Sequence, residues 1–286
     1  MVKFKYGKIL VAIDGSESGR HALKEAFRLA ADEKSWITVV SVVPPYEGEL
    51  ELIGIKSIAQ AMRQPCERAL ADAMDLAKAV GALIKPVCEE GDPYERIVDL
   101  ADAENCDVVV MGRKGASHLD KSLVGSVAAR VIGHSRRDVL IVPNSFPLGW
   151  KKVLIATDGS KYSGIASEKA IDFAQSYGGE VKVVSVVDVP SEFYAEAPDA
   201  VEDMVGKAKE FVKHIISQAE AAGLKAESFV GEGEAFSVIT KLAEKEQVDI
   251  IVMGSHGRTG LRRLLMGSVA EKVIGYAPCP ILVVRE

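Results

Sequence analysis

The sequence predicts an α/β protein that consists of two doubly wound domains, each built on a five-stranded parallel sheet. Two observations lead to this fold class. Short apolar, β-rich runs alternate with longer helical stretches along the whole chain, a pattern typical of right-handed βαβ units. The second half of the chain also repeats the order of elements in the first.

In the first half, five apolar runs mark strands and the stretches between them mark helices. The run VVVM at 108–111 is apolar on both faces, as expected of a strand buried inside a parallel sheet. We expect strands at 8–13, 36–43, 83–88, 107–111 and 138–142, with helices from about 17 to 32, near 57–80, from 93 to about 104, and from about 126.

The second half follows the same order. Its strand runs are KVLIAT at 152–157, VKVVSVV at 181–187, KAESFV at 225–230, DIIVM at 249–253 and PILVV at 280–284. The segments 44–56 and 188–198, which follow the second strand of each half, contain Pro and Glu and differ in sequence. We expect both to be mobile loops.

The two halves are a tandem duplication. The tripeptide Asp-Gly-Ser at 14–16 recurs at 158–160, and residues 107–142 share 16 identities in 36 positions with residues 249–284. The segment 143–150, PNSFPLGW, has the turn chemistry of a short linker. A period as long as a whole domain predicts one domain at 1–145 and another at 150–286.

Charge and hydropathy exclude several classes of partner. The formal net charge is −6, with −2 over residues 1–150 and −4 over residues 151–286. Neither half has the cationic excess that attracts nucleic acid or an anionic membrane surface. No apolar run approaches the ~18 residues that a membrane span needs, and the N-terminus shows no cleavable leader pattern. We expect a soluble cytoplasmic protein.

The four cysteines, Cys66, Cys88, Cys106 and Cys279, form no CxxC pair and have no histidine at metal-binding spacing. Cys88 and Cys106 lie in or beside apolar runs, where a free thiol behaves as a small hydrophobic side chain. We therefore expect reduced thiols rather than a disulfide or a redox role.

Motifs of the common enzyme classes are absent from the sequence. It contains no GxxxxGK[ST] loop, no GxGxxG after the first strand, no GxSxG and no HExxH. The sequence therefore supports no hydrolase or metalloenzyme chemistry, and we nominate neither a catalytic residue nor a metal ligand.

A glycine pattern follows the fourth strand of each half. Two residues separate Gly112 from Gly115, and nine more precede Gly125-Ser126; Gly254, Gly257 and Gly267-Ser268 repeat this spacing. Glycines let the backbone turn sharply and let a ligand approach. Ser126 and Ser268 are good N-cap residues, and a helix N-terminus attracts phosphate. The alternative is that the glycines only build a turn, but identical spacing in both copies favours an anion site.

Both halves resemble universal stress protein domains. The matching motifs are VAIDGS and IATDGS in the first strands, VVVMG and IIVMG in the fourth, and the G-2x-G-9x-G-S box. The resemblance covers nearly the whole chain apart from the loops after the second strands. It implies the fold shared with adenine nucleotide α-hydrolase-like proteins, with strand order 3-2-1-4-5. In that order the first and fourth strands, which end at Asp14 and Gly112, meet at the switch point where open sheets bind ligands.

The nine-residue spacing resembles the ATP-binding branch of the family, which implies a set of adenine nucleotide contacts. In the first half these are Ala12, Ile13, Asp14, Val42, Met111, Gly112, Arg113, Gly115, Gly125, Ser126 and Val127. In the second half they are Ala156, Thr157, Asp158, Val186, Met253, Gly254, Ser255, Gly257, Arg258, Gly267, Ser268 and Val269.

Several of these positions have a second interpretation. The DGS tripeptides are good turn chemistry, so Asp14 and Asp158 can serve as turn residues as well as ligand contacts. The basic residues Arg113 and Lys114 in the first half, and Arg258, Arg262 and Arg263 in the second, can meet phosphates or remain solvated loop charges. We interpret His256 as a surface histidine rather than an acid or base.

The leading functional hypothesis is a nucleotide-dependent regulatory or stress-response module that binds ATP, or AMP or ADP, with Mg²⁺ on the phosphates. The resemblance also implies that the two domains form an intramolecular pseudo-dimer through their last strands and that two chains can form a homodimer. The alternatives are a slow ATPase and a scaffold in which one site, more readily the first, or both are inactive.

Overall fold

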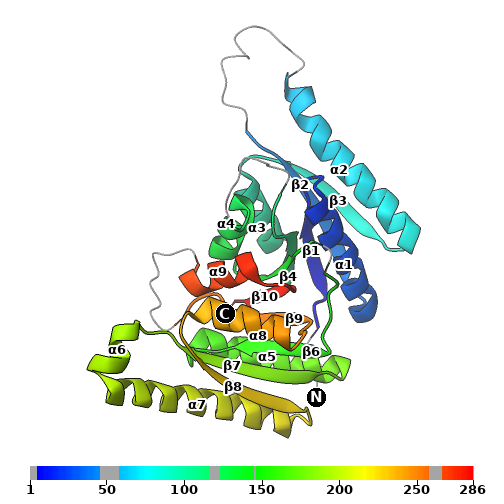
Figure 1. Ribbon diagram of the computed structural model, residues 1–286. Helices are drawn as coiled ribbons and strands as arrows, with labels where there is room; N and C mark the ends of the chain where they lie inside the picture. Colours follow the sequence, from blue (N-terminus) through cyan, green and yellow to red (C-terminus); the bar gives the residue numbers. More distant parts are fainter. Residues whose placement is uncertain (1–4, 46–57, 116–122, 145, 258–265, 286) are drawn as a thin grey trace. The chain divides into compact units, whose positions relative to one another are not determined.

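The computed structural model of the chain describes residues 5–45, 58–115, 123–144, 146–257 and 266–285. They form two compact units, one spanning Tyr6–Ser145 and the other containing Phe146–Glu286. Each unit is a parallel sheet of five strands with helices on both of its faces (Figure 1). The predicted fold class is confirmed.

The first domain has its strands in the order β3-β2-β1-β4-β5, and every neighbouring pair is parallel. The strands are β1 (Lys8–Ala12), β2 (Trp36–Val43), β3 (Ile84–Glu90), β4 (Val108–Gly112) and β5 (Asp138–Val142), and the helices are α1 (Glu17–Glu33), α2 (Ile58–Val80), α3 (Pro93–Ala103) and α4 (Ser126–His134). Helices α1 and α2 contact each other, as do α3 and α4. Figure 1 shows the two pairs on opposite sides of the strands.

The second domain repeats this topology in the order β8-β7-β6-β9-β10. Its strands are β6 (Lys152–Ala156), β7 (Glu180–Val187), β8 (Ala226–Glu232), β9 (Ile250–Gly254) and β10 (Ile281–Val284), and its helices are α5 (Lys161–Tyr177), α6 (Ser191–Glu196), α7 (Pro198–Ala221), α8 (Ala235–Lys245) and α9 (Ser268–Tyr276). Here too every neighbouring pair is parallel. Strand one lies beside strand four in both sheets, so both domains place a switch point at the ends of these strands.

The central strands form the core of each domain. Ile9, Leu10 and Val11 of β1 are fully buried, and so are Val108, Val109 and Val110 of β4. Burial on both faces explains why these strands read as unbroken apolar runs. In the described part of the chain, no helix combines the length and the apolar character of a membrane span.

The expectation of a loop at 188–198 is wrong in part. Residues Ser191–Glu196 form α6, and α7 begins at Pro198. The physical reason is local: the α6 sequence SEFYAE contains no Gly or Pro, and Pro at the first position of a helix is favourable because its missing N–H has no partner there anyway. The corresponding segment of the first domain lies mostly outside the described residues.

The expectation of four free thiols is also wrong. Cys66 of α2 and Cys88 of β3 form a disulfide, with their Cα atoms 6.3 Å apart, whereas Cys106 and Cys279 are free and buried. Helix α2 packs against β2 and β3, which brings together two residues separated by 22 positions. Spacing rules detect pairs that are close in sequence and could not detect this one.

Candidate functional site

A cavity of about 690 Å³ opens at the carboxyl ends of β1, β2 and β4 in the first domain. Its volume lies within the range of small-molecule sites, ~300–1,000 Å³. The structure brings together around this cavity all eleven first-half residues that the sequence predicts. These are Ala12, Ile13, Asp14, Val42, Met111, Gly112, Arg113, Gly115, Gly125, Ser126 and Val127.

The turn after β1 places Asp14 at the mouth of the cavity. One oxygen of its carboxylate, Oδ1, accepts a hydrogen bond from the Ser16 N–H at 3.0 Å. Ser16 in turn caps α1, because its Oγ accepts from the Gly19 N–H at 3.0 Å. Asp14 therefore has the turn role that the sequence allows, and its other oxygen, Oδ2, lies 2.5 Å from where a Cβ on Gly115 would be.

Gly112 lies where α1 crosses the end of β4. A Cβ at this position would be 2.8 Å from the Ser18 carbonyl carbon and closer still to its hydroxyl. Ser18 is itself buried, so neither atom can move aside easily. The first glycine of the box thus has a packing role as well as a place in the cavity wall.

The structure corrects the predicted cap of α4. The N-cap residue is Gly125 rather than Ser126, and a glycine has no side chain with which to cap the helix. The Gly125 N–H donates to the Arg113 carbonyl oxygen at 2.9 Å, which ties the helix start to the loop after β4. The first N–H groups of a helix have no partner inside the helix, and Ser126, Val127 and Ala128 line the cavity. The positive end of the α4 dipole therefore faces the cavity.

The charged lining of the cavity favours an anion. Arg113 and Lys114 both line it, and Asp14 is the one acidic residue among the described lining residues. Burial lowers the pKa of the Arg113 guanidinium from its usual value, but a guanidinium remains protonated in proteins. Two cationic side chains and a helix N-terminus thus outweigh one carboxylate.

The apolar lining that α2 and α3 contribute was not predicted from the sequence. Ala61, Met62, Pro65 and Cys66 of α2 line the cavity, and so do Pro93 and Ile97 of α3. These residues belong to no motif, and their helical spacing is equally typical of ordinary core packing. Only the tertiary packing of α2 over the strand ends shows that they border a hollow.

The second domain has the same framework at the ends of β6 and β9. Ala156 and Thr157 are buried, and Asp158 Oδ1 accepts from the Ser160 N–H at 3.0 Å, as Asp14 does from Ser16. A Cβ on Gly257 would lie 2.7 Å from Asp158 Oδ2, and one on Gly254 would lie 2.8 Å from the Tyr162 carbonyl carbon. Val186 is the penultimate residue of β7, and Met253 precedes Gly254 on β9.

Helix α9 starts as α4 does. Gly267 is its N-cap, again without a side-chain hydrogen bond, and Ser268 and Val269 open the helix. The Gly267 N–H donates to the Ser255 carbonyl oxygen at 3.3 Å. The prediction that Ser268 caps the helix is therefore wrong in the same way as for Ser126.

The loop after β9 differs from its counterpart in the first domain. Ser255 is buried, and its Oγ lies 3.0 Å from His256 Nδ1. The His256 ring is tilted against the Tyr162 ring with 5.6 Å between centroids, so this histidine is half-buried and packed against α5 rather than a solvated surface residue. Arg258, Arg262 and Arg263 lie outside the described residues.

The described residues contain no group of three or more His, Cys, Asp or Glu side chains placed to hold a metal ion. A metal ion at the first site would need most of its oxygen ligands from a bound molecule rather than from the described side chains.

Comparison with known proteins identifies the family. The sequence model of the universal stress protein family matches residues 5–143 and 149–285. A universal stress protein of Methanocaldococcus jannaschii is 39% identical over 142 residues, which cover 48% of this chain and 83% of that protein. The crystal structure of a universal stress protein in complex with cAMP is 30% identical and covers 50% of this chain and 100% of that one, with a TM-score of 0.40.

The two-domain fold also has a solved counterpart. The crystal structure of a universal stress protein from Archaeoglobus fulgidus aligns with a TM-score of 0.74 and covers 98% of this chain and 96% of that one, at 24% identity. That likeness shows the fold, and the two family matches cover both halves. The chain therefore belongs to the universal stress protein family and carries two domains of that family in tandem.

Proposed function

We propose that each domain binds an adenine nucleotide and that nucleotide occupancy is the state that a regulatory partner reads. The observation that carries the proposal is the cavity of about 690 Å³ at the switch point of the first domain. It combines an apolar wall with a cationic, glycine-lined floor, which is the combination that a nucleotide needs.

The two ends of the cavity suit the two ends of a nucleotide. Met62 and Pro65 of α2, with Val42 of β2, supply apolar surface for a base. The phosphates fit at Gly115 and at the start of α4, where the glycines allow close approach and the helix dipole favours negative charge. Arg113 and Lys114 lie within reach of the same region.

Magnesium fits this site as a partner of the phosphates. Mg²⁺ is commonly held by one or two carboxylates, water and substrate phosphates, and Asp14 is the carboxylate that the described lining offers. The residues present would therefore hold the metal through the nucleotide, where it would neutralise phosphate charge.

The second domain supports the same proposal through its framework. Asp158, Gly257 and Gly267 reproduce the turn, the close approach and the uncapped helix start of the first domain. We therefore propose two nucleotide sites per chain.

The deciding experiment measures nucleotide carried by the purified chain. The protein is purified without added nucleotide and denatured, and the released nucleotide is quantified per chain by liquid chromatography and mass spectrometry. We expect adenine nucleotide at one to two per chain, or binding of that stoichiometry by calorimetry after adding ATP with Mg²⁺. A chain that releases none and binds none would overturn the proposal and leave the glycine boxes as architecture.

A further inference from the structure

We infer that the Cys66–Cys88 disulfide is a redox lock on the ligand site of the first domain, so that the bonded state binds nucleotide more tightly than the dithiol state. This inference rests on the proposed function, because the ligand whose affinity changes is the proposed nucleotide. The second domain has no such lock, so the two sites of one chain are expected to respond differently to the same reductant.

The first step of the argument is the position of Cys66. It lies on α2, is 2% exposed, and lines the cavity together with its neighbours Met62 and Pro65. Its sulfur lies 3.5 Å from the carbonyl oxygen of Ser41, which also lines the cavity. The disulfide is therefore part of the ligand wall and not a remote crosslink.

The second step is the element to which Cys66 is bonded. Cys88 lies on β3, the edge strand of the sheet, and is paired in register with Ser41 of β2. The bond fixes the wall helix α2 to the sheet at the level of the cavity. It thereby holds the apolar wall at a set distance from Val42 and from the start of α4.

The third step is the chemistry of opening. Cys88 is half-buried and Cys66 is buried, so we place the first attack of a dithiol reductant at the Cys88 sulfur. The reductant thiolate attacks Cys88 Sγ, forms a mixed disulfide and releases the Cys66 thiolate, which takes up a proton. The second thiol of the reductant then displaces Cys88 as a thiol, and the reductant leaves as a disulfide. Two electrons and two protons enter the protein, and a disulfide-forming oxidant reverses the change.

The fourth step is the effect on the wall. Two non-bonded sulfur atoms cannot remain as close as two bonded ones, because their repulsion sets in well beyond the bonding distance. Reduction therefore removes the tether between α2 and β3, so that the Cys66 side chain can turn toward the cavity and α2 can move away from β3. Either change disturbs a wall that is preorganised for the ligand, and loss of preorganisation weakens binding.

The second domain provides a natural control for this inference. The strand register places Val230 of β8 opposite Ser185, as Cys88 is placed opposite Ser41. Ala208 of α7, which is buried as Cys66 is, occupies the equivalent helix position, counted from the glycines Gly81 and Gly223 that follow the two helices. The chain itself thus shows which pair of residues replaces the disulfide in this fold.

The test uses full-length chains in which one site is disabled. Gly257→Val leaves the first site, and Gly115→Val leaves the second. Affinity for ATP with Mg²⁺ is measured for each after oxidation and after treatment with dithiothreitol, and free thiols are counted in denaturant. We expect two free thiols in the oxidised chain and four in the reduced one. We also expect reduction to weaken the first site by about fivefold or more and to leave the second unchanged.

A third chain carries Cys66→Ala and Cys88→Val, the pair that the second domain uses, together with Gly257→Val. Its affinity is expected to be the same in both conditions. Amide hydrogen exchange supplies a readout that needs no nucleotide, and exchange in α2 is expected to rise on reduction in the native chain but not in this variant.

The outcomes separate the two proposals. Four free thiols in the chain after oxidation would overturn the redox lock, as would equal affinities of the first site before and after reduction. Absence of ATP binding in both single-site chains and in the native chain would instead overturn the proposed function. A response of the second site equal to that of the first would show a general effect of the reductant and would also overturn the lock.

Discussion

The two domains share the framework of the site and differ in the helix that covers it. In both, an aspartate after strand one bonds to the turn, a glycine allows close approach to that aspartate, and a glycine starts the last helix without a side-chain cap. The covering helices α2 and α7 share few residues. The duplication has therefore retained the turn after strand one and the start of the last helix, while the helix that covers them has diverged.

One position on the covering helix shows this divergence most clearly. In the second domain, the Phe211 ring of α7 lies against the turn at Gly159, where a Cβ would be 2.5 Å from the ring. In the first domain, the equivalent residue is Ala69, whose Cβ would be 3.8 Å from a Cβ on Gly15. The same turn is thus covered by an aromatic ring in one domain and by a methyl group in the other.

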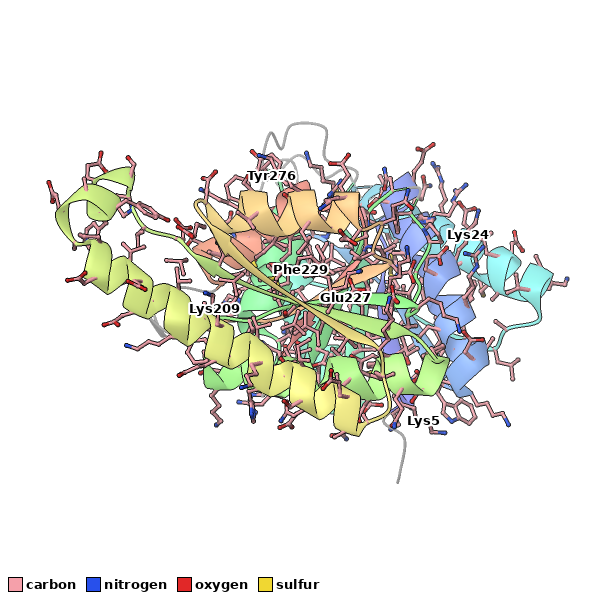
Figure 2. All side chains as sticks on the ribbon, turned by 60° about the horizontal axis from the view of Figure 1, so that its bottom comes forward. Lys5, Lys24, Lys209, Glu227, Phe229 and Tyr276 are labelled. Carbon is pink, nitrogen blue, oxygen red and sulfur yellow. A yellow bond between two sulfur atoms is a disulfide. The ribbon has the colours of Figure 1, made fainter. Side chains whose placement is uncertain are left out.

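The sheets also differ in one buried polar position. Lys182 of β7 is buried, and its Nζ contacts Glu227 at 2.6 Å and Glu246 at 3.1 Å. Glu227 and Phe229 are labelled on β8 in Figure 2, and the Phe229 ring centroid is 5.7 Å from the same ammonium group.

At the equivalent place in the first domain, Thr38 donates to Glu104, and the cation is the exposed Lys85 on β3. The lysine of the cluster therefore lies on the edge strand β3 in the first domain and on β7, the neighbour of the edge strand, in the second. The buried member is a hydroxyl group in the first domain and an ammonium group in the second.

The largest expected effect is on ligand binding. Gly115→Val and Gly257→Val should each weaken nucleotide binding at their own site by ~100-fold or more, because the new side chain would overlap the Asp14 or Asp158 carboxylate. Calorimetry with ATP and Mg²⁺ measures the remaining stoichiometry, which should fall by one site per substitution. Gly164→Ala, at an exposed position with nothing within 4 Å of the new Cβ, is the control.

The sequences of the two glycine-box loops alone favour a larger loss of nucleotide affinity for the substitution at Gly257. The Cβ overlaps at Gly115 and Gly257 are similar, however, so we expect losses of similar size. A clearly larger loss at Gly257 would show that the first site contributes little to binding.

The next effect concerns the buried lysine. Lys182→Met should lower the free energy of unfolding by about 2 kcal/mol, because it leaves the partly buried Glu246 with the exposed Lys245, 3.8 Å away, in place of the buried ammonium group. Thr38→Val in the first domain loses a hydrogen bond and should cost less, about 1 kcal/mol. Denaturant unfolding of the two variants checks the order, and equal costs would contradict the distinction between the two clusters.

The same cluster predicts a pH dependence. Hydrogen bonds from Lys182 and Lys225 lower the pKa of Glu227 from 4.5 to about 2. A depressed carboxyl pKa contributes stability that is fully present above pH 4.5 and is lost as the pH falls toward 2. Carbon-detected NMR titration should find this low pKa in the native chain and a value nearer 4.5 in Lys182→Met. An ordinary pKa in the native chain would contradict the ion pair.

A comparable effect is expected from the covering helix of the second domain. Phe211→Ala should lower the free energy of unfolding by about 2 kcal/mol, because it removes a half-buried ring and leaves the turn at Gly159 uncovered. Phe211→Leu, which keeps part of the contact, should cost less. Thermal unfolding checks the series, and an unchanged melting temperature for both variants would show that the ring contact does not stabilise the turn.

The smallest effect is at the helix caps. Ser16→Ala and Ser160→Ala should each cost about 1 kcal/mol. The loss should be larger for Ser16, whose Oγ accepts at 3.0 Å, than for Ser160, whose Oγ accepts from the Ser163 N–H at 3.3 Å. Ser16→Asp, which can still accept this hydrogen bond, serves as the control in denaturant unfolding. A greater loss at Ser160 would reverse the order.

Much of the fold could be predicted because its signals are local. The run WITVVSVV became β2 (Trp36–Val43), and Pro93 opens α3 as its turn chemistry indicates. The glycine spacing also located the floor of the site, because each glycine follows a strand end or opens a helix. Such signals depend on neighbours in the chain and survive without tertiary information.

The rest of the site depends on packing between distant segments. Met62 and Cys66 line the cavity only because α2 packs over β2 and β3, and an amphipathic helix has the same pattern wherever it packs. The disulfide could not be predicted for the same reason, because Cys66 and Cys88 meet only through the packing of α2 against β3. The N-cap was assigned one residue too late, because a serine is the commoner cap and only the backbone angles identify Gly125.

The glycine N-caps of α4 and α9 have a consequence for the stability of these helices. A side-chain cap contributes ~1 kcal/mol to a helix, and a glycine supplies none. Under the proposed function, a phosphate bound at these helix starts would accept hydrogen bonds from their first N–H groups and stabilise the segment that leads into the last strand. Nucleotide binding would then raise the local stability of that segment. A partner protein could distinguish the nucleotide-bound chain from the nucleotide-free chain by this difference in stability.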